Sequence, residues 1–194
     1  MNYLDDIITV LDIFSLVTGV IFIIMQIVQH KWMWHFQIAT ALSAMIVAID
    51  ARIWAFAILN FYFITMAFLG IYRWKKAEEQ VGEGSIHIAR FSRKAIPISA
   101  SVVFIGGPIV YFVLSATSDP APFLDAATLV LSLVGSYWLT RSYLAQWFVW
   151  VVADSFGVLL NFSQDKIGLG ILYSVYILSA VIGYFNWKKN GVYV

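Results

Sequence analysis

The second half of this chain repeats the first at a fixed offset of 113 residues. No gap is needed: Asp12 aligns with Asp125, and Trp34 aligns with Trp147. The two copies end on a shared pattern, in which Gly70, Trp74, Lys75 and Lys76 align with Gly183, Trp187, Lys188 and Lys189. Such a repeat indicates one structural unit that is built twice. In a sufficiently apolar chain, two matching halves are typical of transporters, whose halves move around a site between them.

The composition places the chain in a membrane. Hydrophobic residues make up 61% of it and charged residues 12%, and the mean hydropathy is +0.83. A soluble domain of 194 residues could not bury this much apolar surface, so we expect a polytopic membrane protein. Without cysteine, and with three scattered histidines, the chain offers no disulfide and no zinc-ligand cluster, and we expect no metal and no cofactor. The acidic first residues form no cleavable signal, so the first helix is predicted to be retained.

Seven apolar segments have about the 20 residues that a helix needs to cross the hydrocarbon core of a membrane. They are residues 7–28, 32–49, 53–73, 95–116, 122–140, 143–162 and 167–187.

The repeat divides these segments as 3+1+3. We predict an all-α membrane protein with two parallel three-helix repeats joined by a linker helix. The predicted parts are a first repeat (1–76), a cytoplasmic loop (77–94), a linker transmembrane helix (95–118) and a second repeat (119–194). Because the linker crosses once, both repeats point the same way. Within the linker, Gly106-Gly107-Pro108 should kink the helix or allow a neighbour to approach closely.

The positive charges predict the orientation. Ten of the 12 Lys and Arg residues fall on one side of the predicted topology, and only Arg52 and Lys166 fall on the other. Cytoplasmic loops carry the excess of Lys and Arg, so the amino terminus is expected outside and the carboxyl terminus in the cytoplasm. Lys75-Lys76 and Lys188-Lys189 are interpreted as anchors at the inner interface.

The segment 143–162 carries the densest unusual chemistry. Trp147, Trp150 and Asp154 are spaced three and four apart and so share one helical face, which Asn161 extends. Asp154 would lie about 16 Å from the inner end of its helix, near the bilayer midplane. A carboxylate there is costly unless it faces a partner or a watery cavity, which makes it a candidate binding residue. Two indoles beside it could receive a flat cation.

A packing role is the alternative for these residues. Both Trp side chains could belong to the inner aromatic belt, and Asp154 could pair with a neighbouring helix. Capping or packing is favoured for Asp12 and Asp125, which lie in the first turns of their helices.

The repeat points to counterparts in the other half. Gln37 takes the place of Trp150, and an alanine takes that of Asp154, so a symmetric scaffold would hold an asymmetric site. Trp34 is the counterpart of Trp147. Asn60 aligns with Tyr173, and the residue aligned with Tyr176 is a phenylalanine; these side chains could line the same cavity. Asn60 could equally be a hydrogen-bonding contact between helices.

The motif Trp147-x-x-Trp150-x-x-x-Asp154 resembles the Trp-x-x-Trp-x-x-x-Asn signature of the PnuC family of bacterial vitamin transporters. The ends of the two repeats, Gly70 to Trp74 and Gly183 to Trp187, resemble the same family, and the 3+1+3 layout is shared in outline with SWEET sugar transporters.

The resemblance implies facilitated diffusion of an unphosphorylated, water-soluble vitamin through a bacterial inner membrane, with trapping by a separate intracellular kinase. It also implies the lipid bilayer as surroundings, no nucleic-acid partner, and a homo-oligomer such as a trimer. Asp154 departs from the family's Asn. An ionised Asp only accepts hydrogen bonds and adds a charge, which favours a cationic substrate with several donors. We therefore expect thiamine, with nicotinamide riboside as the alternative.

Three other functions compete with vitamin transport. A membrane receptor or scaffold would use the aromatic face only for packing, and a sugar carrier would use the same fold. An enzyme is disfavoured, because no nucleophile with its base and no paired acids occur at a useful spacing.

Overall fold

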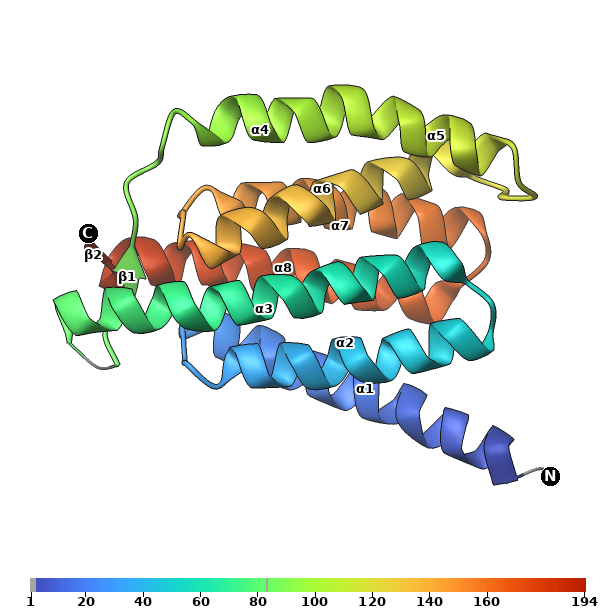
Figure 1. Ribbon diagram of the computed structural model, residues 1–194, viewed down its shortest axis with the longest axis horizontal. Helices are drawn as coiled ribbons and strands as arrows, with labels where there is room; N and C mark the ends of the chain where they lie inside the picture. Colours follow the sequence, from blue (N-terminus) through green and yellow to red (C-terminus); the bar gives the residue numbers. More distant parts are fainter. Residues whose placement is uncertain (1–2, 83) are drawn as a thin grey trace. The chain divides into compact units, whose positions relative to one another are not determined.

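Helices form wherever the sequence supplies a long apolar run, because a helix satisfies every backbone group internally and can therefore lie in lipid. The computed structural model describes residues 3–82 and 84–194. Met1 and Asn2, which carry the predicted outer terminus, lie outside the described residues. In chain order (Figure 1), the elements are α1 (Tyr3–Ile27), α2 (Met33–Asp50), α3 (Trp54–Val81), β1 (His87–Ile88), α4 (Ala95–Ser101), a π-helical turn η1 (Val102–Gly106), α5 (Gly107–Ser115), α6 (Pro122–Thr140), α7 (Gln146–Ser163), α8 (Ile167–Asn190) and β2 (Val192–Tyr193).

The helices agree with the seven apolar segments, and one boundary differs clearly. Helix α3 continues to Val81, so the first five residues of the loop predicted at 77–94 are helical. This extension contains Ala, Glu and Gln, which favour helix even beyond an apolar segment.

Within the described residues, six segments are long and apolar enough to cross a membrane. Helix α7, predicted as a span at 143–162, is not one of them. Its 18 residues include Gln146, Asp154 and Asn161, which lower its hydropathy.

The predicted distortion at Gly106-Gly107-Pro108 takes the form of a π-helical turn. Residues 95–115 run as α4, η1 and α5 without a break, and Pro108 stands in the first turn of α5. Proline cannot donate a backbone hydrogen bond to the preceding turn, and a π-helical turn is one way to accommodate that loss. A Cβ at Gly106 would meet no atom within 4 Å, so that glycine does not serve a close approach.

The chain divides into two units, one ending at His87 and the other running from Ile88 to Val194. In the first unit, α2 lies between α1 and α3 and packs against both. In the second, α7 lies in the same way between α6 and α8, and α5 packs against α6. The middle helix of each unit carries part of the predicted site, Trp34 and Gln37 on α2 and the Trp147, Trp150 and Asp154 motif on α7.

Positions 113 residues apart have the same local backbone. Helices α2 and α7 begin and end at equivalent residues. The turn before each contains a left-handed residue, Gln29 (φ 52°) or Ser142 (φ 54°), and the turn after each contains another, Arg52 (φ 60°) or Asp165 (φ 57°). Four non-glycine residues in this rarely occupied region, paired in this way, indicate that the two segments fold by the same local rules.

A tryptophan packed on a glycine joins α2 to α3. Trp34 is 1% exposed, and a Cβ at Gly70 would overlap its indole ring. Trp74, one turn beyond Gly70, meets Trp34 edge to face with ring centroids 4.9 Å apart. Glycine at this position therefore lets the indole lie directly against the backbone of α3.

The second unit repeats this contact between α7 and α8. Trp147 is 2% exposed, and a Cβ at Gly183 would overlap its ring. Trp187 meets Trp147 edge to face at 5.3 Å. The identities that first indicated the repeat thus build one packing unit twice.

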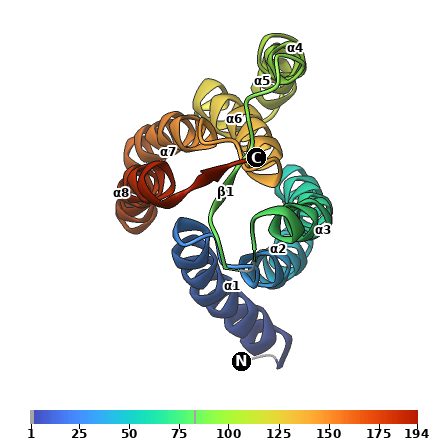
Figure 2. The same ribbon diagram turned by 90° about the vertical axis from the view of Figure 1, so that its left-hand side faces the viewer.

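A short segment after α3 adds β-structure to a chain predicted to be all-α. Strands β1 and β2 pair in a two-stranded sheet, in which the Val194 N–H donates to the Ile88 carbonyl at 2.9 Å (Figure 2). Before it, the Gln29 side chain holds the backbone of His87 twice, donating to its carbonyl at 2.9 Å and accepting from its N–H at 2.6 Å. His87 is 2% exposed and lies 5.3 Å from the Trp74 ring. Burial lowers the pKa of His87 from 6.5 to about 4, although the Ser85 backbone partly offsets this effect.

The glycine contact predicts unequal effects of two alanine substitutions in α8. Gly183→Ala should lower the free energy of unfolding by about 1–3 kcal/mol, since the indole of Trp147 must move. Gly168→Ala is the matched control, because no atom lies within 4 Å of a Cβ there, and it should leave stability unchanged or slightly higher. Thermal unfolding of the detergent-solubilised protein measures both. Equal effects would contradict the packing role of Gly183.

Burial of His87 predicts a loss of stability in acid. The pKa of His87 is lower in the folded chain (about 4) than in the unfolded chain, so its stabilising contribution is complete above pH ~6.5. That contribution is lost as the pH falls toward 4, by up to about 3 kcal/mol. The variant His87→Phe lacks this loss, so the difference in unfolding free energy between wild type and variant should change from pH 7.5 to pH 4.5. A constant difference would show that His87 is not buried in its neutral form.

Candidate functional site

The predicted binding residues of the second unit lie on two sides of α7. Trp147 contacts Gly183 of α8, whereas Trp150 contacts Gly135 of α6, where a Cβ would stand 3.0 Å from the indole. The spacing predicted one shared face. In the structure the two indoles leave that face toward different neighbouring helices, so they do not form one stacked receptor.

Asp154 is buried without a bonded partner. It is 7% exposed, and among the described residues no hydrogen bond or salt bridge to its carboxylate is found. A buried charge is costly unless an opposite charge or hydrogen-bond donors compensate it. Among the described residues, no cationic side chain on a neighbouring helix pairs with Asp154, as the packing alternative would require.

Two tyrosines of α8 lie beside Asp154. Tyr173 and Tyr176 are close enough to Asp154 to interact with it electrostatically, and their ring centroids are 5.6 Å apart. Tyr173 lies on Gly157, where a Cβ would overlap its ring. One carboxylate and two phenol hydroxyls are thus brought together between α7 and α8, and this group can accept hydrogen bonds from a ligand, donate to it and stack on it.

Trp147 serves packing in this structure. Its ring packs against Gly183 and meets Trp187, and the side chain is 2% exposed, so the ring is largely used in contacts between α7 and α8. Trp150 is more accessible. Its indole nitrogen is buried and has no hydrogen-bond partner among the described residues, so it can donate to a bound molecule.

The two predicted asparagines bond to their own helices. The Asn161 amide donates to the Gly157 carbonyl at 2.8 Å, and the Asn60 amide donates to the Phe56 carbonyl at 2.8 Å. Both side chains are buried, Asn161 at 6% and Asn60 at 4% exposure. One donor of each is therefore already in use.

The first unit places its candidates on the middle helix, α2. Trp34 is packed on Gly70 in the same way as its counterpart, Trp147. Gln37 is 8% exposed, and its side-chain oxygen is buried with no hydrogen-bond partner among the described residues. Gln37 therefore keeps an acceptor free for a ligand, at the position where the second unit has Trp150.

The sequence analysis missed the glycines that support the site. Gly135 lies under Trp150, and Gly157 lies under Tyr173. The signal was available, because a glycine in an apolar helix marks a close approach of a neighbour, and Gly157 follows Asp154 by three residues.

The family model described as nicotinamide mononucleotide transporter matches residues 9–189. The chain belongs to this family of membrane transporters. The resemblance to the PnuC family is thereby confirmed.

Named relatives support the same family. The riboflavin/roseoflavin transporter RibM of Streptomyces davaonensis is 23% identical over 91% of this chain and 83% of its own length. The nicotinamide riboside transporters PnuC of Haemophilus influenzae and Neisseria mucosa are 24% and 27% identical, each over 66% of this chain. These alignments span only 57% and 52% of the two PnuC proteins.

A solved structure supports the fold. The crystal structure of the vitamin B3 transporter PnuC matches with a TM-score of 0.68 at 20% sequence identity, over 92% of this chain and 80% of that one. None of these relatives is named for thiamine, so the expectation of thiamine gains no support from them, and nicotinamide riboside is the better supported alternative.

The unpartnered carboxylate predicts that a charge-removing substitution will not destabilise the protein. Without ligand, the free energy of unfolding of Asp154→Asn should be at least that of the wild type. An increase of about 1 kcal/mol is expected, because the substitution removes a buried charge that has no partner. Asn161→Ala is the control on the same helix and should cost about 1 kcal/mol, since it loses a hydrogen bond to Gly157. Denaturation of the purified protein measures both. A marked loss of stability in Asp154→Asn would mean that Asp154 is a structural partner.

Proposed function

We propose that this chain carries an unphosphorylated vitamin nucleoside of the nicotinamide riboside kind across the bacterial inner membrane by facilitated diffusion. The observation that carries the proposal is the buried carboxylate of Asp154, which has no partner among the described residues and lies beside Tyr173 and Tyr176. Nicotinamide riboside brings a pyridinium cation, an amide and sugar hydroxyls. The cation compensates the carboxylate, and the amide and hydroxyls can bond to the two tyrosines.

The same carboxylate disfavours a phosphorylated substrate. The description of the family names nicotinamide mononucleotide, which is nicotinamide riboside with a phosphate added. A second negative charge near Asp154 would be repelled in a low-dielectric site. Uptake of the free nucleoside, followed by phosphorylation by a separate kinase, is therefore the more consistent route, and the phosphorylated product would be trapped inside.

Riboflavin is the second candidate. RibM, named for riboflavin and roseoflavin, aligns over 83% of its own length, more than either PnuC relative. Riboflavin offers a flat ring and many hydroxyls but no cation, so it would use the aromatic side chains and not the charge of Asp154. Dependence on that charge separates the two candidates.

The proposed topology is 3+1+3, with α1–α3 and α6–α8 as parallel repeats and α4–α5 as the linker, in outline like SWEET transporters. The matched backbones of the two segments support it. We include α7 as a seventh span, because it packs along α6 and α8, which are apolar enough to cross. The proposed orientation has the amino terminus outside and the carboxyl terminus in the cytoplasm, and the distribution of Lys and Arg supports it.

The transport experiment uses purified protein in sealed liposomes without a pH or sodium gradient. Labelled nicotinamide riboside should enter until its concentrations inside and outside are equal, and nicotinamide mononucleotide should not enter. Asp154→Asn should lower the apparent affinity for nicotinamide riboside about tenfold or more, because a charge-assisted interaction is lost. Asp165→Asn, on an exposed turn, is the control and should behave like the wild type.

Four results would contradict the proposal. Uptake of none of the vitamins would favour a receptor or scaffold, and uptake of sugar alone would favour a sugar carrier. Riboflavin uptake that is unaffected by Asp154→Asn, with no uptake of nicotinamide riboside, would favour the second candidate. Uptake of thiamine in preference to nicotinamide riboside would restore the original expectation.

A further inference from the structure

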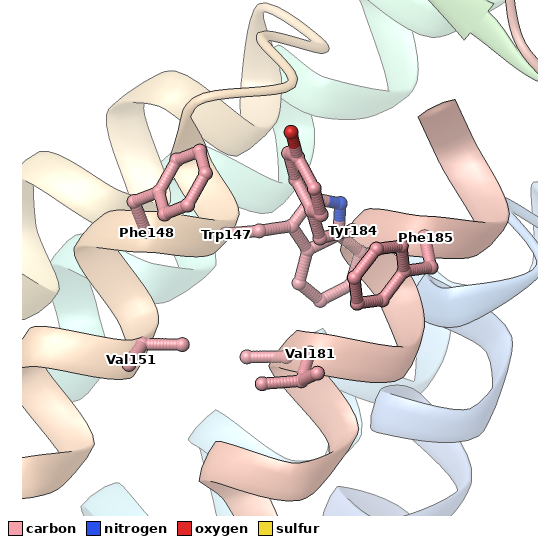
Figure 3. A pocket seen from close by; sticks show the side chains of 7 residues that line it. Trp147, Phe148, Val151, Val181, Tyr184 and Phe185 are labelled. Carbon is pink, nitrogen blue, oxygen red and sulfur yellow. The ribbon is translucent and has the colours of Figure 1, made fainter. Parts of the chain in front are cut away.

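A groove with an entirely apolar lining runs between α7 and α8, away from the group formed by Asp154, Tyr173 and Tyr176. Its lining residues are Trp147, Phe148, Val151, Ala180, Val181, Tyr184 and Phe185. Val151 of α7 and Val181 of α8 point toward one another across it (Figure 3). None of these side chains offers a charge, and the site proposed above uses none of them for binding.

The base of the groove is a buried indole ring, and exposed aromatic side chains lie along its sides. Trp147, held against Gly183, forms the floor. Phe148 is 56% exposed, and its ring lies 4.8 Å from that of Tyr184; Phe185 is 62% exposed. An apolar groove between two helices that face lipid is filled by whatever apolar chain the surroundings supply.

A lysine side chain lies at one end of the groove. The Lys188 ammonium lies 5.6 Å from the centroid of the Tyr184 ring, and Lys189 follows it in the last turn of α8. An apolar groove with the Lys188 ammonium at its end complements a molecule with a hydrocarbon chain and an anionic head. That combination is the chemistry of an anionic phospholipid.

The first repeat shares the floor and the cation but only part of the aromatic walls. Trp34 and Lys75 correspond to Trp147 and Lys188. The counterparts of the wall residues Phe148 and Tyr184 are instead a histidine and an isoleucine, and Val181 corresponds to Phe68. Phe185 has an aromatic counterpart, Tyr72, so only the pair formed by Phe148 and Tyr184 is particular to the second repeat.

We infer that the groove between α7 and α8 binds one acyl chain of an anionic phospholipid whose phosphate is held at Lys188. This lipid would seal the groove over Trp147 and support the contact between Trp147 and Gly183 from the lipid side. The inference does not depend on which substrate the chain carries, because it uses none of the substrate-binding residues proposed above.

Native mass spectrometry of the full chain, with phosphatidylglycerol or phosphatidylcholine added, tests the inference. Val181→Phe gives the groove the residue that the first repeat carries and should abolish retention of both lipids. Val175→Phe is the control, on an exposed position of α8 outside the groove. Lys188→Gln should weaken phosphatidylglycerol about fivefold and leave phosphatidylcholine unchanged. Lys166→Gln, at the other end of α8, should change neither lipid.

The inference fails if Val181→Phe retains phosphatidylglycerol as well as Val175→Phe does. It also fails if Lys188→Gln and Lys166→Gln have equal effects, since the headgroup is then not held at Lys188. A change in oligomeric state in Val181→Phe, without loss of lipid, would identify the groove as an interface between copies of the chain. Because Lys188 is exposed, its variant keeps the test decisive even if Val181→Phe fails to fold.

Discussion

The packing of one indole on one glycine fixes the middle helix of each unit. In the first unit, Trp34 packs on Gly70 and brings α2 close to the backbone of α3. In the second, Trp147 packs on Gly183 and brings α7 close to the backbone of α8. In lipid, helices gain little from hydrophobic burial and associate through close packing, so a glycine under a large flat ring is an effective contact. The candidate binding residues Asp154, Tyr173 and Tyr176 lie on α7 and α8, the two helices that this contact joins in the second unit.

A repeated backbone carries unequal side chains. The backbone of α2 and its flanking turns is reproduced in α7, including the left-handed residues at Gln29 and Ser142. The side chains above that backbone differ: Gln37 stands where the second unit has Trp150, and Ala41 where it has Asp154. Repetition therefore maintains the fold, while single substitutions on the middle helix set the charge and shape of the site.

Much of the fold could be predicted from the sequence because its signals are local. Apolar length predicted the helices, and identities at one offset predicted matched segments. The left-handed turns, the extension of α3 to Val81 and the pairing of β1 with β2 depend on turn chemistry, propensity and a contact between distant residues, which apolar length does not report. Spacing placed Trp147 and Trp150 on one face of α7, but it could not say which neighbour each ring would meet, and the glycines on α6 and α8 decide that. The preference for thiamine came from the charge of Asp154, and charge alone does not separate one cationic vitamin from another.

In the proposed function, the unpartnered carboxylate of Asp154 selects a cationic ligand. Calorimetric titration of the purified protein with nicotinamide riboside and with its dihydro form, which lacks the pyridinium charge, tests this directly. The wild type should bind the cation about tenfold or more tightly than the neutral form, and Asp154→Asn should bind both alike. Equal affinities of the wild type for the two forms would contradict it.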